Sequence, residues 1–309
     1  MTRRCCQLLL TCCLLWSSAF ADDHQHAPII VRSAPVIQRL PLRVIHPIDV
    51  AVTAAGDTLV ADRAGRMVFR VDADGETSVL GKDLDGLVRI AASRSFGVHT
   101  LLRGQRSGQV IRLLETGFRE DVCELSFVPA GLGVDAIGNI WTANPQAGVV
   151  VQLDSSGVPQ SVIPLSGVPV DIAVDGLGAV VLLRSGQLVS VAADGSQSPV
   201  GYVPANASRL KMTADHAVVA LVVDDDGKSM LVRPTPDRES VDRFAMAPRG
   251  TSAFAFDQLG NLTLANPELR AITCVTSHFT VPCPHCGQHV PMLFSPDAPA
   301  RLTPTRRSF

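Results

Sequence analysis

Short runs of alternating apolar and polar residues, separated by glycine-containing turns, fill most of this chain. Residues 49–60, 131–141 and 171–181 each consist of an apolar run, a short polar turn and a second apolar run. A period of two is typical of β-strands, and glycine supplies the positive φ that tight hairpin turns require. No stretch has the 3.6-residue period of an amphipathic helix, so the pattern predicts an all-β chain.

The turn glycines recur at intervals of about 40 residues. One series consists of Gly56, Gly97, Gly138, Gly178 and Gly260, with His216 at the equivalent place in one repeat. A second series comprises Gly65, Gly108, Gly148, Gly186 and Gly227, and a third comprises Gly75, Gly117, Gly157 and Gly195. Three series with one period predict repeats of four short strands joined by three turns.

One such sheet cannot bury both of its faces alone, whereas sheets stacked around an axis cover each other and leave few exposed edges. The sequence therefore predicts a six-bladed β-propeller of four-stranded antiparallel blades over residues 41–282. Two segments are candidates for the strand that closes the ring: residues 278–281, or residues 29–38 within an N-terminal extension at 22–40. The residue pattern does not decide between them.

The repeats resemble those of NHL-repeat propellers. Residues 47–62 are similar to the strand–turn–strand signature of that family, residues 169–178 repeat its first half, and residues 139–144 and 261–266 its second half. The likeness covers about residues 40–282. Blades 2 and 5 depart most, since residues 90–94 lack the aspartate and His216 replaces a glycine. The resemblance implies the architecture, and the family includes binding scaffolds, lyases and relatives of lactonases.

The N-terminus has the features of a secretory signal peptide over residues 1–21. Arg3 and Arg4 precede a short apolar stretch, and Ala19-Phe20-Ala21 matches a cleavage signature. Cys12 is an alternative lipid-modification site, which the bulky Thr11 disfavours. We expect export to the periplasm or the extracellular space. Residues 283–309 form a predicted Cys/His-containing, Pro-rich tail, disordered over 290–309.

Charge and hydropathy restrict the partners. Without Arg3 and Arg4 the chain keeps 25 of its 27 basic residues against 29 acidic ones, so nucleic acid is not an expected partner. No later run approaches the roughly 18 apolar residues that a membrane span needs. We expect a monomer that binds a protein, peptide or carbohydrate.

Three side chains are candidates for chemistry at the channel mouth. Asp49 and Asp171 occupy equivalent places in blades 1 and 4, on opposite sides of a six-fold ring, and His46 precedes the first blade. Two facing carboxylates could hold a divalent cation or polarise a substrate, and histidine could act as an acid. The alternative is that the aspartates accept backbone N–H bonds and that His46 is a surface residue.

The tail holds a possible zinc site. The segment Cys283-Pro-His285-Cys286-Gly resembles half of a zinc knuckle, with Cys274 and His289, or His278, as further ligands. A disulfide from Cys274 to Cys283 or Cys286 is the alternative, because an exported protein can form one. Cys123 is either a free thiol or the partner that ties the tail to blade 3.

The function predicted from these features is a binding scaffold for a protein, peptide or carbohydrate partner. No complete catalytic constellation is visible, while the framework residues recur in most blades. The alternative is a metal-assisted lyase or lactonase-like enzyme at the channel mouth, with Asp49, Asp171 and His46 as its catalytic residues.

Overall fold

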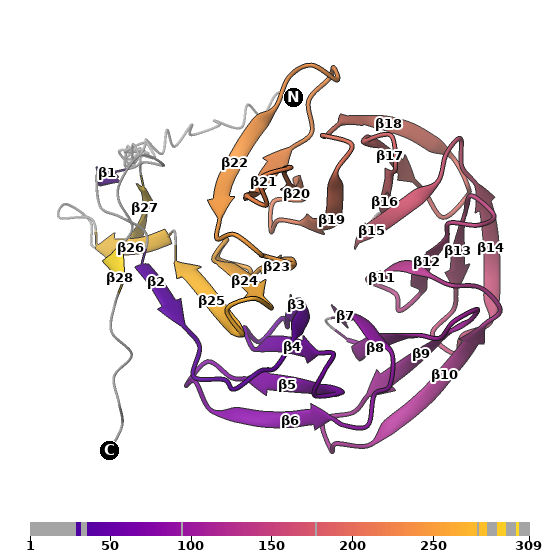
Figure 1. Ribbon diagram of the computed structural model, residues 1–309, viewed down its shortest axis with the longest axis horizontal. Coiled ribbons are helices and arrows are strands. Elements are labelled where there is room, and N and C mark those ends of the chain that lie inside the picture. Colours follow the sequence, from indigo (N-terminus) through magenta and orange to yellow (C-terminus); the bar gives the residue numbers. More distant parts are fainter. Residues whose placement is uncertain are drawn as a thin grey trace, which may run out of the picture.

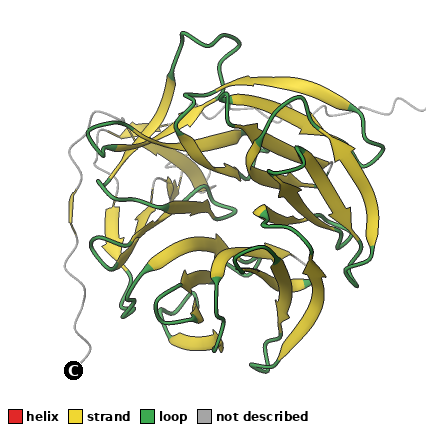
Figure 2. Ribbon diagram, turned by 45° about the vertical axis from the view of Figure 1, so that its right-hand side comes forward, coloured by secondary structure: helices red, strands yellow, loops and turns green. Residues whose placement is uncertain are grey.

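Six four-stranded antiparallel sheets form a closed ring in the computed structural model (Figure 1). The structure describes residues 29–31, 36–93, 95–176, 178–276, 278–282, 289–294 and 301–302. These residues form strands and loops without a helix (Figure 2). The predicted six-bladed β-propeller is confirmed.

Five blades are built from consecutive strands. Blade 1 comprises β3 (Pro47–Val52), β4 (Thr58–Asp62), β5 (Met67–Val71) and β6 (Thr77–Gly81). Blade 2 comprises β7 (Leu87–Ser93), β8 (Gly97–Arg103), β9 (Gly108–Leu113) and β10 (Arg119–Leu125). Blade 3 comprises β11 (Ala130–Val134), β12 (Ile140–Asn144), β13 (Val149–Leu153) and β14 (Pro159–Pro164). Blade 4 comprises β15 (Pro169–Asp175), β16 (Gly178–Leu183), β17 (Gln187–Val191) and β18 (Gln197–Tyr202). Blade 5 comprises β19 (Ala207–Met212), β20 (Val218–Val223), β21 (Ser229–Arg233) and β22 (Asp242–Ala247).

Blade 6 is completed by the N-terminal segment. Its first three strands are β23 (Ala253–Phe256), β24 (Leu262–Asn266) and β25 (Ala271–Thr276). The outer strand is β2 (Val36–Arg39), which pairs antiparallel with β25 from Val36↔Thr276 to Arg39↔Thr273. Of the two closing segments left open by the sequence, the structure therefore uses the N-terminal one.

A smaller sheet lies outside the ring. Strand β26 (His278–Pro282) pairs with β27 (His289–Phe294), and β27 pairs in parallel with β1 (Ile29–Val31). Strand β28 (Arg301–Leu302) adds to β2 in parallel. The tail that was predicted to be disordered thus contains two strands, because residues 289–294 pair with β26 and residues 301–302 pair with β2.

The hydrophobic core is distributed between blades. One cluster joins blades 1, 2 and 3, and others join blades 3 and 4, blades 4 and 5, blades 5 and 6, and blades 6 and 1. Each sheet therefore buries its apolar faces against its neighbours. Burial of this kind contributes roughly 25 cal/mol per Å² of apolar surface, so the closed ring stabilises every blade.

The two ends of the ring carry different connections. We call the end where the innermost strands begin the entry face, and the end where they finish the exit face. Hairpin turns from the first to the second strand and from the third to the fourth strand of each blade lie on the exit face. The remaining connections lie on the entry face.

Candidate functional site

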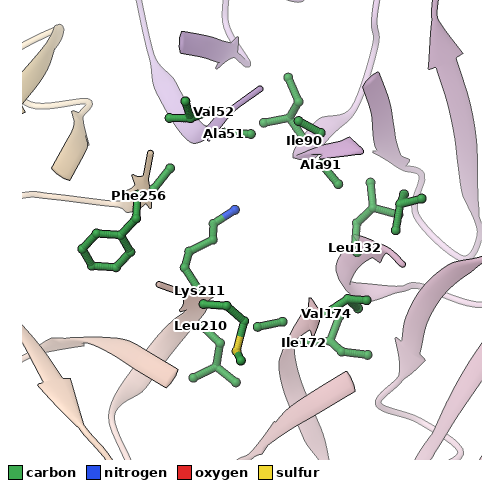
Figure 3. Close-up of a pocket in the computed structure, with 16 residues that line it drawn as sticks. Ala51, Val52, Ile90, Ala91, Leu132, Ile172, Val174, Leu210, Lys211 and Phe256 are labelled. Carbon is green, nitrogen blue, oxygen red and sulfur yellow. The ribbon is translucent and has the colours of Figure 1, made fainter. Parts of the chain in front are cut away.

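The innermost strands β3, β7, β11, β15, β19 and β23 surround a central channel (Figure 1). The half of the channel toward the exit face contains a cavity of about 180 Å³. Small and apolar side chains line most of it, among them Ala51, Ala91 and Ala173. Lys211 projects into the middle of this space (Figure 3), so its ammonium group is the one charged group among otherwise apolar side chains.

Nearer the entry face, one position of each innermost strand forms what we call the channel ring. Its members are Asp49, Arg89, Gly131, Asp171, Arg209 and Ala253 in blades 1 to 6. In four blades this position directly follows a β-bulge. Bulges redirect a side chain from the regular pleat, and they recur at the rims of closed sheets.

The two aspartates of the channel ring connect neighbouring blades. Asp49 is fully buried; its Oδ1 accepts the N–H of Val50 at 3.0 Å and its Oδ2 accepts the N–H of Ile90 at 3.0 Å. Asp171 Oδ2 accepts the N–H of Leu210 at 2.8 Å. Ile90 and Leu210 belong to the next blade in each case, so each carboxylate joins two sheets at the channel.

Arg89 pairs with Asp171 across blade 3. Its Nε and Nη2 both lie 3.4 Å from Asp171 Oδ1. Gly131 leaves room for this contact: a Cβ there would lie 2.9 Å from Asp171 Oδ1 and 2.6 Å from the side chain of Ile172. Its φ of +73° also favours glycine. An uncharged gap in the ring therefore permits an ion pair between blades 2 and 4.

Arg209 has a different environment. Its Nη1 donates to the carbonyl of Ser208 at 3.0 Å, but its Nε is buried without a hydrogen-bond partner. Burial, followed by repulsion from Arg89, lowers the pKa of Arg209 to about 10, against an opposing effect of Asp171 and Asp49. At neutral pH the guanidinium is still charged.

The structure gathers two of the three predicted channel-mouth residues. Asp49 and Asp171 lie in the ring, with Arg89 beside Asp171 and the Lys211 Nζ 3.6 Å from Asp49 Oδ1. His46 lies exposed at the entry face, where its backbone N–H donates to Asp62 Oδ1 at 2.8 Å. The catalytic roles of these three residues stay predictions.

The channel ring does not fit a divalent cation between the two aspartates. Such an ion would share the space with Arg89, Arg209 and Lys211, and like charges in a poorly solvated site repel strongly. Among the residues that the structure describes, no group of three His, Cys, Asp or Glu side chains could hold a metal ion.

Arg89, Arg209 and Lys211 are not among the residues predicted from the sequence. The signal for the arginines is present, because aligning the six repeats places both at the position of Asp49 and Asp171. Lys211 was equally visible, since the other blades have alanine or glycine there.

The predicted zinc site falls largely outside the described residues. Cys274 is a partly buried free thiol in β25, and burial, aided by Asp257, raises its pKa. Cys283 and Cys286 lie outside the described residues, and His289 begins β27. Zinc and disulfide both stay predictions. Cys123 is a free thiol in β10 of blade 2, and burial raises its pKa too.

No model of a protein family matches the chain, and no curated protein matches its sequence. Solved structures do match. Virginiamycin B lyase from Staphylococcus aureus superposes with a TM-score of 0.56 at 15% identity, over 78% of this chain and 98% of the lyase. A gluconolactonase from Xanthomonas campestris gives 0.60 at 15%, over 81% and 96%. The WD40 repeats of RRP9 give 0.57 at 9%, over 79% and 99%. At these identities the likeness establishes the propeller fold alone.

Proposed function

We propose that this protein is an exported, NHL-type propeller that acts as a binding scaffold, and that its exit face binds a basic segment of a protein or peptide. The observation that carries the proposal is the separation of charge between the two faces of the ring. Placement in the periplasm or outside the cell belongs to the same proposal, because it rests on the signal-like residues 1–21.

Acidic residues dominate the exit-face turns. They are Asp57, Asp72, Asp74, Glu76, Glu115, Asp135, Asp154, Asp194, Asp215, Asp237, Glu239 and Asp257. Among the described residues of these turns, Arg238 is the only lysine or arginine. Asp57, which pairs with Arg70 at 2.7 Å, and Asp135 are buried, and the other ten are at least partly exposed. An array of one sign raises the local concentration of oppositely charged partners and speeds their association.

The entry face has the opposite balance. Its connections carry Arg43, Arg63, Arg66, Lys82, Arg106, Arg184, Lys228, Arg249 and Arg270. Six acidic residues accompany them, namely Asp83, Asp85, Asp224, Asp225, Asp226 and Glu268. The net charge of −2 for the whole chain therefore conceals an acidic face and a weakly basic one.

Apolar side chains stand among the acidic groups of the exit face. Ile137 is 75% exposed in the β11–β12 turn, Leu259 is 70% exposed in the β23–β24 turn, and Phe118 is 73% exposed in the β9–β10 turn. Large exposed apolar residues beside charge are typical anchors of protein interfaces. A neutral carbohydrate would not make use of the acidic field, which favours a protein or peptide partner.

A pair of designed peptides tests the proposal. We expect a fluorescent amphipathic Lys/Leu peptide to bind, an otherwise identical Glu/Leu peptide not to bind, and the affinity to fall as salt is raised. Fluorescence anisotropy measures both. The double variant Ile137→Ser/Leu259→Ser should weaken binding about thirtyfold, since each side chain contributes on the order of 1 kcal/mol of burial and the two together about 2 kcal/mol.

The matched control is Val162→Ser, which removes a 60% exposed apolar side chain from outer strand β14 instead. It should leave the affinity unchanged. Equal binding of the two peptides, or equal weakening by the control variant, would contradict the proposed function.

A further inference from the structure

The channel ring consists of two similar halves. Blades 1 to 3 supply Asp49, Arg89 and Gly131, and blades 4 to 6 supply Asp171, Arg209 and Ala253. The backbone contacts repeat as well. Asp49 accepts the N–H of Ile90, the residue after Arg89, and Asp171 accepts the N–H of Leu210, the residue after Arg209. The two arginines also repeat a contact: each Nη1 donates at 3.0 Å to the carbonyl of its preceding residue.

The two halves differ in what the arginines face. Arg89 reaches past Gly131 to Asp171, whereas no described carboxylate accepts a hydrogen bond from Arg209. The carboxylate that corresponds by this symmetry is Asp49, and Lys211 lies 3.6 Å from its Oδ1. Blade 6 also has Ala253 where blade 3 has Gly131, so the space that admits Arg89 to Asp171 is not repeated, and Lys211 is the cation beside Asp49.

Lys211 is the exception at its own position. The equivalent residues in the other five blades are Ala51, Ala91, Gly133, Ala173 and Ala255. Without a lysine there, two aspartates would balance two arginines. With it, the ring and its neighbour contain three positive and two negative groups. Arg209 and Lys211 are half-buried, and the Nε of Arg209 is buried without a hydrogen-bond partner. A charged donor that is shielded from water and lacks a partner is unfavourable, so an anion beside it would be stabilising.

We propose that the channel binds a small anion, a carboxylate or an inorganic oxyanion, at Arg209 and Lys211. A planar guanidinium donates two parallel hydrogen bonds to such groups, and an ammonium adds a compact charge. Lys211 enters the cavity of about 180 Å³, and Arg209 precedes it by two residues on the same innermost strand β19. A ligand that contacts both is therefore limited to a small acid or a free inorganic ion. This site is independent of the partner proposed for the exit face.

Titration with inorganic phosphate and with acetate tests the site. At constant pH and a fixed background of sodium chloride, each anion is added and the thermal unfolding midpoint is recorded, with calorimetry for the affinity. A ligand that binds only the folded state raises the midpoint, by roughly 2–4 °C once its concentration is about ten times Kd. We expect such a rise with at least one of the two anions.

Variant Lys211→Ala is the decisive comparison. It removes one of the two proposed anion-binding groups and balances the ring charges, so the anion-dependent rise should disappear. Folding should survive because Asp49 keeps its two backbone hydrogen bonds, from Val50 and Ile90. Arg209→Gln should also abolish the rise. The matched control Lys82→Ala, an exposed lysine of the entry face, should keep it.

Two results would overturn the inference. One is a wild-type midpoint that neither phosphate nor acetate changes. The other is a rise that Lys211→Ala retains in full, which would place the anion elsewhere on the molecule.

Discussion

At the scale of single residues, the buried polar groups of this propeller fall into two kinds. Asp49 and Asp171 are satisfied by backbone N–H groups and cations, while His99 is not satisfied. Both ring nitrogens of His99 are buried without a hydrogen-bond partner among the described residues. At the corresponding position of the second strand, other blades have apolar side chains, such as Leu59 in blade 1 and Trp141 in blade 3.

His99 should make stability depend on pH. Burial, aided by the charge of Arg112 and opposed by Glu120, lowers its pKa from 6.5 to about 4. Below pH 6.5 His99 is protonated in the unfolded chain, whereas in the folded protein it is protonated only near pH 4. The free energy of unfolding is therefore highest above pH 6.5 and falls by up to about 3 kcal/mol as the pH decreases to 4.

The variant His99→Leu removes this titration and keeps most of the volume. Denaturant unfolding at pH 7.5 and at pH 5 should show a smaller difference for the variant than for the wild type. If the difference in unfolding free energy between pH 7.5 and pH 5 is the same for variant and wild type, His99 has the same pKa in the folded and the unfolded protein.

Asp171→Asn tests whether this residue is structural or catalytic. The substitution removes the charge partner of Arg89 in a buried site, so we expect the free energy of unfolding to fall by about 3 kcal/mol. The exposed turn variant Asp194→Asn is the control, with a much smaller expected loss. A metal-assisted enzyme would instead lose divalent-metal binding and turnover with little change in stability. Metal analysis of both proteins separates the outcomes.

The sequence repeat predicts that Asp49 and Asp171 occupy equivalent positions, but it does not predict the cations that they contact, Arg89 and Lys211. Turn periodicity fixes which residues point toward the channel; it does not say that an arginine of blade 2 crosses to blade 4. That contact depends on the space at Gly131, which becomes meaningful only once blades 3 and 4 pack together.

At the scale of elements, every blade followed from the alternating runs and turn glycines, including blades 2 and 5 with their atypical residues. The closing strand could not be predicted, because residues 29–38 and 278–281 are both short alternating runs. Pairing with β25 selects between them, and this is a long-range contact that no local pattern encodes. Arg39 adds to it, since its Nη2 donates to the carbonyls of Leu269 and Arg270.

Removal of β2 should open the ring. A chain that lacks residues 22–40 exposes the edge of β25, and we expect a lower unfolding midpoint and concentration-dependent association, because bare strand edges pair with other chains. The control lacks only residues 22–28 and keeps β1 and β2. Light scattering and thermal unfolding compare the two. Similar behaviour of both chains would mean that β2 contributes little to closure.

At the scale of the whole molecule, the polarity of the two faces follows from turn chemistry. Exit-face hairpins use aspartates such as Asp135 and Asp154 whose carboxylates accept backbone N–H groups inside the turn. Repetition of one favourable turn around six blades therefore accumulates negative charge at one end. Within the described residues, no helix is long and apolar enough to cross a membrane.

The joint between β2 and β25 also sets the order in which the molecule can be assembled. Residues 36–39 leave the ribosome early and must wait, unpaired, until residues 273–276 have emerged. Blades 1 to 5 can form during that interval, but the circle cannot. Ring closure therefore requires a contact between segments that are separated by most of the chain, which is the slowest kind of contact to form. It can occur only after nearly the entire chain has been synthesised.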